Sequence, residues 1–402
     1  MASIEVDFAG FRCPNPFILA SAPPTNTGEM IERAFDQGWG GAVIKTLTYD
    51  YTKYKNVNPR IHAIKQDGRV IGFTNFELGA QKPIDEWLED VVRIKKNCPE
   101  HLLLASLLHT EGLVESQWKE VARRFAQAGV DGFELNFSCS HGMAEGGGGA
   151  TIGSSVGLIQ EVVGWIRRTV TLPIMVKLPA MVENIPQKAK AAKEAGADAI
   201  SAINTLNCLN GMDVYTFTPY PRVDGKSAFS GLSGAMIRPV GLRCVAQIAQ
   251  NVKIPISGIG GIANWEDTVQ YILVGASTVQ ICSAVMQYGY RIIEDLTHGL
   301  ADYMEKMEFA HISDFVGLGL PSIMPHRELS RDYRLASHVD RTQCVGCGLC
   351  VIACRDSGYQ AISMGKDRIA FVDEEKCDGC GLCKGICPVE GCMELKRKES
   401  KG

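Results

Sequence analysis

The sequence predicts an α/β chain in two parts: an eight-stranded parallel (β/α)8 barrel, followed by a small cysteine-rich domain. Short β-branched or apolar stretches alternate with amphipathic helical patterns over about the first three hundred residues, the length that an eightfold barrel needs. Glycine-rich turns follow the last two of these stretches, and two dense runs of cysteines lie near the C-terminus. We expect the barrel at 1–310, a linker at 311–335 and the second domain at 336–402.

The composition favours a cytoplasmic enzyme that acts on small molecules. A chain of 402 residues, 46% of them hydrophobic, can bury a large core and form more than one domain. The net charge of −4 gives no electrostatic reason to expect nucleic acid or an anionic membrane as the main partner. The N-terminal stretch MASIEVDFAGFRCPNPF lacks the basic and apolar regions of a secretory signal, and no later apolar run reaches membrane-spanning length. In the cytoplasm, clustered cysteines indicate metal ligation.

Eight strands of the barrel can be assigned from their apolar, β-branched character. The helical stretches between them, such as 115–129 and 184–196, each stop at a glycine that can adopt the left-handed cap conformation. The expected strands are 17–20, 41–46, 102–106, 132–137, 173–178, 199–204, 255–259 and 278–283.

Polar residues at the carboxyl ends of these strands are the candidate active-site residues, because in such barrels those ends open on the catalytic face. Two of them are lysines, and a buried lysine without a partner is expensive, which argues against a purely structural role. The residues at these ends are Lys45, Asn136, Ser138, Cys139, Lys177, Asn204 and Thr205.

The two C-terminal cysteine runs have the spacing C-x2-C-x2-C-x3-C, which is typical of two-cluster ferredoxins. In those proteins the fourth cysteine of one run ligates the other cluster. Zinc sites more often use two separated CxxC pairs, whereas this run of four occurs twice, 33 residues apart. We therefore assign one [4Fe–4S] cluster to Cys344, Cys347, Cys350 and Cys387, and the other to Cys377, Cys380, Cys383 and Cys354.

The glycine-rich turns SGIGGI at 257–262 and VGASTVQICSA at 274–284 indicate a phosphate site, since such loops present backbone N–H groups at a helix N-terminus. Gly258–Ala263 also fits the dinucleotide pattern G-x-G-x-x-A, but Cys282 and Ser283 stand where that motif needs an acid. A phosphorylated cofactor that exchanges single electrons with clusters and electron pairs with a substrate is flavin mononucleotide, FMN.

The chain resembles the dihydropyrimidine dehydrogenase family, specifically its flavin and ferredoxin part, whose barrel is of the dihydroorotate dehydrogenase type. The resemblance covers nearly the whole chain. It is carried by NPFILASAPPT, AFDQGWGGAVIKT, NVNPRI, GFTNFELGA, NFSCSHGM, GLSGAMIRPVGLR, SGIGGI, MQYGYRIIED, CRDSGYQAI and CDGCGLCKGICPVEGC.

The resemblance implies reduction of the 5,6 double bond of a pyrimidine such as uracil or thymine. Hydride passes between FMN N5 and C6, and Cys139 acts as general acid or base at C5, with Ser138 and His141 as neighbours. The implied substrate-binding residues are Asn75, Glu77, Asn136, Ser138, Asn204 and Thr205. The implied flavin-binding residues are Ser21, Lys45, Thr46, Lys177, Gly234, Gly260, Gly261, Cys282 and Ser283.

The glycine-rich stretch 143–153 is expected to close over the substrate and to deliver Cys139. The chain departs from the family pattern at Ser140, where proline is usual, and over 206–230, so the ring need not be uracil itself.

No segment of the chain provides a convincing NAD(P)H site, and the family implies a partner subunit that carries FAD, NAD(P)H and further clusters. Three alternatives stay open. They are a dihydroorotate dehydrogenase-like or related cyclic-amide oxidoreductase, a dihydrouridine synthase acting on tRNA, which would need a basic face, and an electron-transfer module without its own catalysis.

Overall fold

The computed structural model describes residues 2–108, 113–139, 147–357 and 359–398. The chain divides into two compact units, Met1–Ser322 and Ile323–Gly402. The division falls inside the range expected for the linker. Among the described residues, no helix has the length and apolar character needed to span a membrane.

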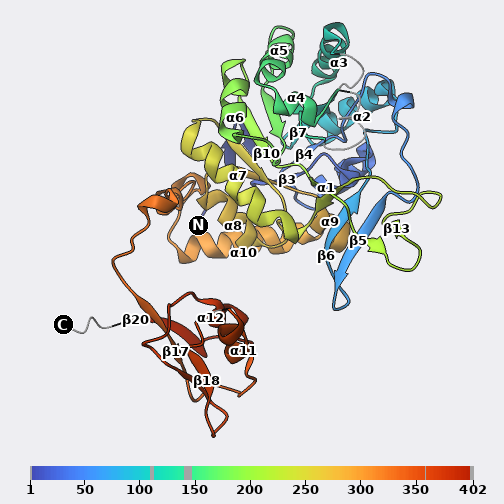
Figure 1. Ribbon diagram of the computed structural model, residues 1–402. Coiled ribbons are helices and arrows are strands. Elements are labelled where there is room, and N and C mark those ends of the chain that lie inside the picture. Colours follow the sequence, from blue (N-terminus) through green and yellow to red (C-terminus); the bar gives the residue numbers. More distant parts are fainter. Residues whose placement is uncertain (1, 109–112, 140–146, 358, 399–402) are drawn as a thin grey trace. The chain divides into compact units, whose positions relative to one another are not determined.

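Eight parallel strands close into a barrel in the first unit, as the sequence predicts (Figure 1). Each observed strand lies within or beside its expected range, and several are shorter. Lys45 therefore follows the end of its strand, while Lys177 lies within its own. The strands are β3 (Phe17–Leu19), β4 (Gly41–Val43), β7 (Leu102–Leu107), β8 (Gly132–Asn136), β9 (Ile174–Leu178), β10 (Ala199–Ala202), β15 (Ile256–Ile259) and β16 (Thr278–Ile281).

Helices surround this barrel (Figure 1). The long ones are amphipathic, and α3 ends before Gly129, whose φ of +100° is the left-handed cap conformation. The helices are α1 (Gly28–Asp36), α2 (Ile84–Asn97), α3 (Glu115–Ala128), α4 (Ala150–Ser154), α5 (Val156–Arg167), α6 (Ile185–Glu194), α7 (Arg238–Asn251), α8 (Trp265–Leu273), α9 (Ser283–Tyr288) and α10 (Ile292–Lys306).

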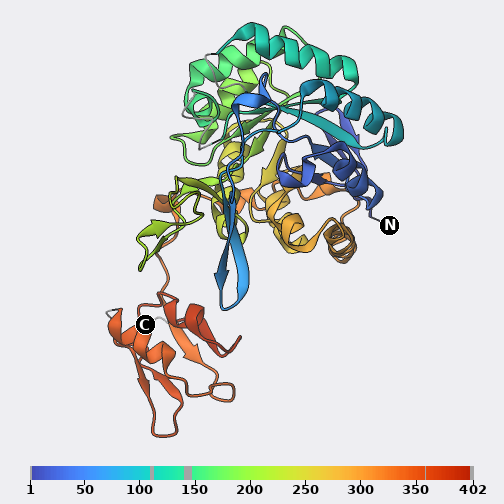
Figure 2. The same cartoon turned by 90° about the vertical axis from the view of Figure 1, so that its right-hand side faces the viewer.

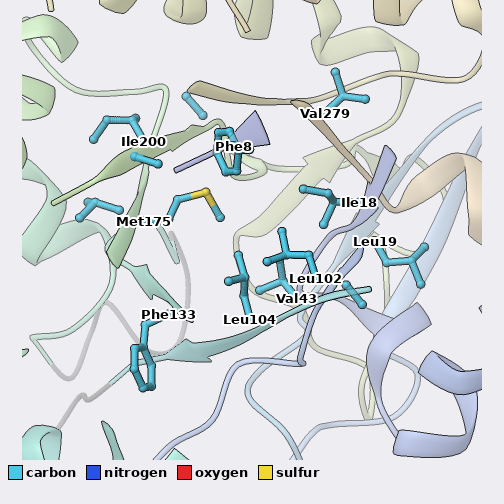
Figure 3. Packing of buried hydrophobic residues seen from close by; sticks show 14 of the residues in the cluster. Phe8, Ile18, Leu19, Val43, Leu102, Leu104, Phe133, Met175, Ile200 and Val279 are labelled. Atoms are coloured by element: carbon cyan, nitrogen blue, oxygen red, sulfur yellow. The ribbon is translucent and has the colours of Figure 1, made fainter. Parts of the chain in front are cut away.

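One continuous apolar core fills the space inside the barrel and between strands and helices. Figure 3 shows part of it, with side chains from several strands, among them Ile18, Leu104 and Val279. The core also includes Phe8, from an N-terminal hairpin that the sequence analysis did not assign, β1 (Val6–Phe8) with β2 (Phe11–Cys13). A Cβ on Gly132, where β8 begins, would lie 3.2 Å from Phe11 Cζ, so the hairpin packs at the amino-terminal end of the strands.

A second sheet, also unassigned from the sequence, joins three segments that follow barrel strands. Its strands lie in the order β11 (Leu206–Cys208), β14 (Ser230–Ser233), β6 (Arg69–Asn75) and β5 (Ile61–Gln66). The hairpin of β5 and β6 extends away from the barrel (Figure 2). A further short hairpin pairs β12 (Met212–Asp213) with β13 (Thr218–Pro219). The divergent segment 206–230 is thus built into a sheet whose ends adjoin Asn75, Thr205 and Gly234.

The second unit is a small α/β domain with twofold internal similarity. It contains β17 (Leu335–Val339), α11 (Leu349–Asp356), β18 (Ile362–Met364), β19 (Ala370–Val372), α12 (Leu382–Ile386) and β20 (Met393–Arg397). β17 pairs with β20, and β18 pairs with β19, both antiparallel. One cysteine run lies between β17 and β18, the other between β19 and β20.

Close packing on Gly241 fixes the turn after β15. The Tyr271 hydroxyl bonds to the carbonyl oxygens of Ile259 at 3.1 Å and Gly260 at 2.8 Å, and so holds the end of that strand. A Cβ on Gly241, in α7, would lie 1.9 Å from this hydroxyl oxygen and 2.9 Å from the Ile259 carbonyl oxygen. Only glycine leaves room here for the helix, the tyrosine and the strand.

Gly241→Ala is therefore expected to destabilise the barrel by about 1–3 kcal/mol, because overpacking forces neighbours out of place. Gly157→Ala in α5 is the matched control. Its Cβ would come no nearer to another group than 4.0 Å from Ser155 Oγ, so better helix propensity should make it neutral or stabilising by up to about 1 kcal/mol. Urea unfolding followed by tryptophan fluorescence reports the barrel, where every tryptophan lies. Equal effects of the two substitutions would contradict this account.

Candidate functional site

A cavity of about 210 Å³ lies at the carboxyl ends of the barrel strands and collects nearly every barrel residue assigned to the site from the sequence. Ser138 is the exception: it is buried and does not line the cavity. The assigned residues that do line it are Ser21, Lys45, Thr46, Asn75, Glu77, Asn136, Cys139, Lys177, Asn204, Thr205, Gly234, Gly260, Gly261, Cys282 and Ser283.

Lys45 is held at the cavity by a buried carboxylate that serves two cations. Its ammonium lies 2.6 Å from Glu77 Oε2, with side chains only 5% and 7% exposed, and Arg60 Nε donates to the other oxygen, Oε1. Burial alone would raise the Glu77 pKa, but the charges and hydrogen bonds of Lys45 and Arg60 outweigh it, so the net pKa lies below its usual value. Two cations sharing one carboxylate leave this corner positive.

Lys177 also pairs with a buried carboxylate, in this case one that lies inside the barrel. Its Nζ lies 3.5 Å from Oε1 of Glu134, a fully buried residue of β8. The other carboxylate oxygen accepts from Ser201 Oγ at 2.8 Å and from Gln280 Nε2 at 2.9 Å. Because a carboxylate only accepts hydrogen bonds, the Gln280 amide must present its NH₂ group to Glu134, and its oxygen points away from that carboxylate. Among the described residues that oxygen is buried and has no hydrogen-bond partner, although Gln280 lines the cavity.

Asn136 and Thr46 form the centre of a hydroxyl and amide network. Asn136 Nδ2 donates to Thr46 Oγ1 at 3.1 Å, and Thr46 Oγ1 also lies 3.0 Å from both Ser21 Oγ and Ser106 Oγ. The network ties together the carboxyl-terminal parts of four barrel strands, β3, β4, β7 and β8.

The carboxamide oxygen of Asn136 extends the network, through Ser138, to Asn204, which follows β10. It accepts from Ser138 Oγ at 2.8 Å, and Asn204 Nδ2 in turn donates to Ser138 Oγ at 3.0 Å. Ser138 does not line the cavity itself, but its hydroxyl holds the side chain of Asn204, which does. Asn75 is held separately, since its amide donates to the Gly231 carbonyl oxygen at 3.0 Å and accepts from Glu77 N at 3.1 Å.

Cys139 lines the cavity against an apolar wall that includes Leu108, Tyr54 and Leu78. Behind it, Ala150 N donates to the Cys139 carbonyl oxygen at 2.9 Å, where α4 begins. Gly149 has a φ of +52°, and a Cβ there would lie 2.5 Å from that carbonyl oxygen. Gly149, the last of the four consecutive glycines, is thus a tight packing point. Ser140, His141 and the 143–146 part of the predicted closing loop lie outside the described residues.

The glycine turns also line the cavity. Gly234, Gly260 and Gly261 all have positive φ. A Cβ on Gly261 would lie 2.9 Å from the Gly234 carbonyl oxygen, so the two turns pack directly on one another. Such turns present backbone N–H groups where a side chain would block them, which suits a phosphate.

Cys282 also lines the cavity, near enough to Lys45 and Lys177 for their charges to act on its thiol. Burial raises the pKa of its thiol to about 11, and the nearby charges of Lys45 and Lys177 only partly oppose this. The thiol is therefore neutral and serves as packing. With two lysines, a buried amide acceptor and glycine turns on one wall, the cavity fits a phosphorylated, hydrogen-bonding cofactor such as FMN.

The cysteines of the second unit line two separate voids. Cys344, Cys347, Cys350 and Cys387 line one of them, and Cys354, Cys377, Cys380 and Cys383 line the other. Among the described residues no three His, Cys, Asp or Glu side chains are grouped closely enough for a single metal ion. Four thiols around a void fit an iron–sulfur cube better than a zinc ion, whose sulfur ligands lie about 2.3 Å from it.

Comparison with known proteins assigns both units. The model of the family described as dihydroorotate dehydrogenase matches residues 3–304. The chain belongs to the dihydroorotate dehydrogenase family. A model of the 4Fe-4S dicluster domain matches residues 337–395. These matches imply FMN in the barrel and two [4Fe–4S] clusters in the second unit.

Three relatives within this wider group show the type of enzyme. The chain is 40% identical to the NAD-dependent dihydropyrimidine dehydrogenase subunit PreA of Escherichia coli over 98% of this chain and 95% of the relative. It is 36% identical to the chloroplastic dihydropyrimidine dehydrogenase (NADP(+)) of Arabidopsis thaliana, over 81% and 79% respectively. It is 32% identical to the catalytic subunit of dihydroorotate dehydrogenase B (NAD(+)) of Pyrococcus abyssi, over 79% and 99%. This family member is an FMN oxidoreductase of the dihydropyrimidine dehydrogenase type.

Several residues of the site were not predicted from the sequence. Glu134 is a charged residue inside the apolar strand GFELN, and that was the available signal. Gln280, Ser106 and Ser201 look like ordinary strand residues, and Arg60 lies far from any barrel strand in sequence. Their roles depend on neighbours that only the closed barrel supplies.

Glu77→Gln is expected to destabilise the FMN-free protein by about 3–5 kcal/mol, because it leaves buried Lys45 without its counter-charge. Glu77 has a lowered pKa, so its stabilisation is complete above the unfolded pKa of about 4.3 and is lost as pH falls through the folded pKa. The difference between variant and wild type should therefore shrink in acid. Urea unfolding between pH 3 and pH 7, monitored by tryptophan fluorescence, measures both effects.

Glu115→Gln is the control, since Glu115 forms an ion pair with Lys119 on the solvent-exposed surface of α3, where water and salt weaken the pair, and its loss should change stability little. A loss from Glu77→Gln no larger than this control would refute the buried-pair account.

Proposed function

We propose that this enzyme reversibly reduces the 5,6 double bond of a pyrimidine base such as uracil or thymine, giving the 5,6-dihydropyrimidine. The observation that carries the proposal is that Cys139 lines the same cavity as two paired lysines and a set of amide side chains. A proton donor, a cofactor wall and groups complementary to a cyclic amide thus face one space.

Cys139 is proposed to be the general acid and base. Reduction of the ring needs one proton at C5, and oxidation returns it, so a single thiol serves both directions. Its backbone is fixed by Ala150 N and by the close approach of Gly149, while the apolar residues beside it keep water from competing as the donor. A thiol suits this role better than a carboxyl group because an ordinary thiol keeps its proton at neutral pH, whereas an ordinary carboxyl group is ionised.

The edge of the pyrimidine is proposed to be read by Asn75, Asn204 and Thr205, with Asn136 behind them. Alternating C=O and N–H groups on the ring suit carboxamides, each of which offers donors and an acceptor. The hydrogen bonds that hold Asn75 and Asn204 leave part of their capacity for a ligand. The Glu77 carboxylate, held ionised by Lys45 and Arg60, supplies a further acceptor.

FMN is proposed to be held by the paired lysines, the Gln280 oxygen and the backbone of the glycine turns. When bound, this cofactor supplies the hydride for C6. The positive charge left by Lys45 and Arg60 around one carboxylate stabilises negative charge that builds up beside it. The second set of contacts comes from Ser21, Thr46, Gly234, Gly260, Gly261, Cys282 and Ser283.

Dihydroorotate is the rival substrate, since a dihydroorotate dehydrogenase subunit is among the relatives. Its ring carries a carboxylate that needs a cation. Of the described residues, only Lys45 and Lys177 bring a cationic side chain to the cavity wall, and both are proposed to contact the flavin, so no further cation on that wall is left for a ring carboxylate. This arrangement favours an uncharged ring.

Electrons are proposed to reach the flavin through the two clusters from a partner subunit that binds FAD and NAD(P)H. The two cysteine-lined voids of the second unit have volumes of only about 20 Å³ each, too small for a dinucleotide. The relative from Escherichia coli is itself a subunit by name. The isolated chain should therefore be reduced by dithionite and not by NADH.

Cys139→Ala is expected to lower turnover of uracil by about 10²–10⁴, the usual contribution of a general acid, while retaining FMN and iron. Anaerobic turnover with dithionite as reductant and uracil, thymine or orotate as substrate measures the loss and the substrate class together. Wild-type turnover by this variant would contradict the proton role, and orotate as the preferred substrate would favour the rival.

Cys208→Ala is the matched control. This thiol lies 3.5 Å from Ser230 Oγ in the second sheet and does not line the cavity. Its removal should leave turnover within about twofold, because no reacting group touches it.

A further inference from the structure

The two cysteine runs repeat at 33 residues, so most positions around one void have a counterpart around the other. Cys344 corresponds to Cys377, and Cys350 corresponds to Cys383. Seven residues before each first cysteine lies a buried strand residue, Ser337 in β17 and Ala370 in β19. These two positions are the same in the fold and differ in chemistry.

Their backbones act in the same way on opposite runs. Ser337 N donates to Cys377 Sγ at 3.4 Å. Ala370 N likewise bonds to Cys344, and together with Gly346 N it keeps the pKa of that thiol below its usual value. Each void thus receives one peptide N–H from the strand that precedes the other run.

The side chains break this symmetry. Ser337 Oγ lies 2.9 Å from Cys383 Sγ, and both residues are buried. A cysteine that binds a cluster is deprotonated, so in the loaded protein the hydroxyl is the donor and the sulfur the acceptor. Ala370 has no hydroxyl to offer Cys350, the counterpart sulfur.

We propose that the Ser337 hydroxyl raises the reduction potential of one cluster and leaves the other unchanged. Ser337 is thus a positioning residue for electron transfer, and the affected cluster is the one held by Cys354, Cys377, Cys380 and Cys383. Hydrogen bonds to ligand sulfur favour the more negative, reduced form of a cluster. In a buried site the bond is little weakened by water. This inference rests on the proposed ligand sets.

Two other differences between the voids are expected to contribute to the difference between the two reduction potentials in the unsubstituted protein. Asp378, exposed, lines the Ser337 void where Val345 lines the other. Cys392 lies against Cys344 and Cys387, where its weak thiol donor contributes, and its counterpart is Tyr359. The proposal therefore concerns the change in a cluster's midpoint potential when the hydroxyl is removed or added. Asp378 and Cys392 are the same before and after each substitution, so they do not contribute to that change.

The test is a redox titration of the whole reconstituted protein, with both clusters followed by electron paramagnetic resonance. Ser337→Ala should make one midpoint more negative, by about tenfold in the reduction equilibrium, which is about 59 mV for a one-electron couple. Ala370→Ser should move the other midpoint in the positive direction. Ser337→Thr, which keeps the hydroxyl, should retain the wild-type value.

A purely structural serine would move neither midpoint while iron content stayed at the wild-type level, and that result would overturn the proposal. So would a shift of the same midpoint by both substitutions. If Ser337→Ala fails to take up iron, Ala370→Ser decides alone, since it only adds a hydroxyl, and an unmoved midpoint there is a refutation. Failure of the wild-type chain to form two clusters would instead refute the proposed ligand sets.

Discussion

The chemistry of this site depends on keeping two lysines charged in a place that water scarcely reaches. A buried ammonium without a partner loses its proton or destabilises the fold. Lys45 and Lys177 avoid this through Glu77 and Glu134, which come from different directions, one from the loop after β6 and the other from inside the barrel. Arg60 adds a second cation to the Glu77 carboxylate, so the pairing does not cancel the charge. The remaining positive charge suits both an anionic cofactor and negative charge formed in the reaction.

The arrangement of strands explains how residues spread over the sequence reach this one space. Barrel closure brings the carboxyl ends of all eight strands to one rim, and the Thr46 and Asn136 network ties four of them together. The second sheet then supplies what the barrel alone lacks. It places Asn75 beside Gly231 and brings Gly234 against the turn at Gly261. The rim therefore has glycine turns and amide side chains, which we propose to face the cofactor and the substrate respectively.

The barrel strands could be predicted because their signal is local. Stretches such as GAVIKT and PIMVKL are apolar, β-branched and bounded by helical patterns, and each became a strand. The second sheet could not be predicted, because β11 and β14 are short, and β14 joins β11 to β6, a strand more than a hundred residues earlier in the chain. The spacing of the cysteines predicts the fold of the second unit directly, since ligand geometry leaves little freedom.

Individual site residues follow the same rule. Lys45 and Cys139 stand out at strand ends, so sequence and position identify them together. Gly149 lies in the stretch predicted to close over the substrate, yet its own φ is positive and its neighbours leave no room for a Cβ. Arg60 and Gln280 carry no sequence signal, because their importance comes from the charge of Glu77 and from an amide oxygen left facing the cavity. Such roles arise only from tertiary contacts.

The central claim is that one cavity holds flavin and an uncharged pyrimidine face to face, with a cysteine supplying the proton. The most direct measurement is anaerobic addition of dihydrouracil to the oxidised, FMN-loaded and cluster-loaded chain, followed by flavin absorbance. The account predicts bleaching of the flavin and formation of uracil, with dihydroorotate much less effective. A flavin that stays oxidised with dihydrouracil and dihydrothymine but is bleached by dihydroorotate would contradict it.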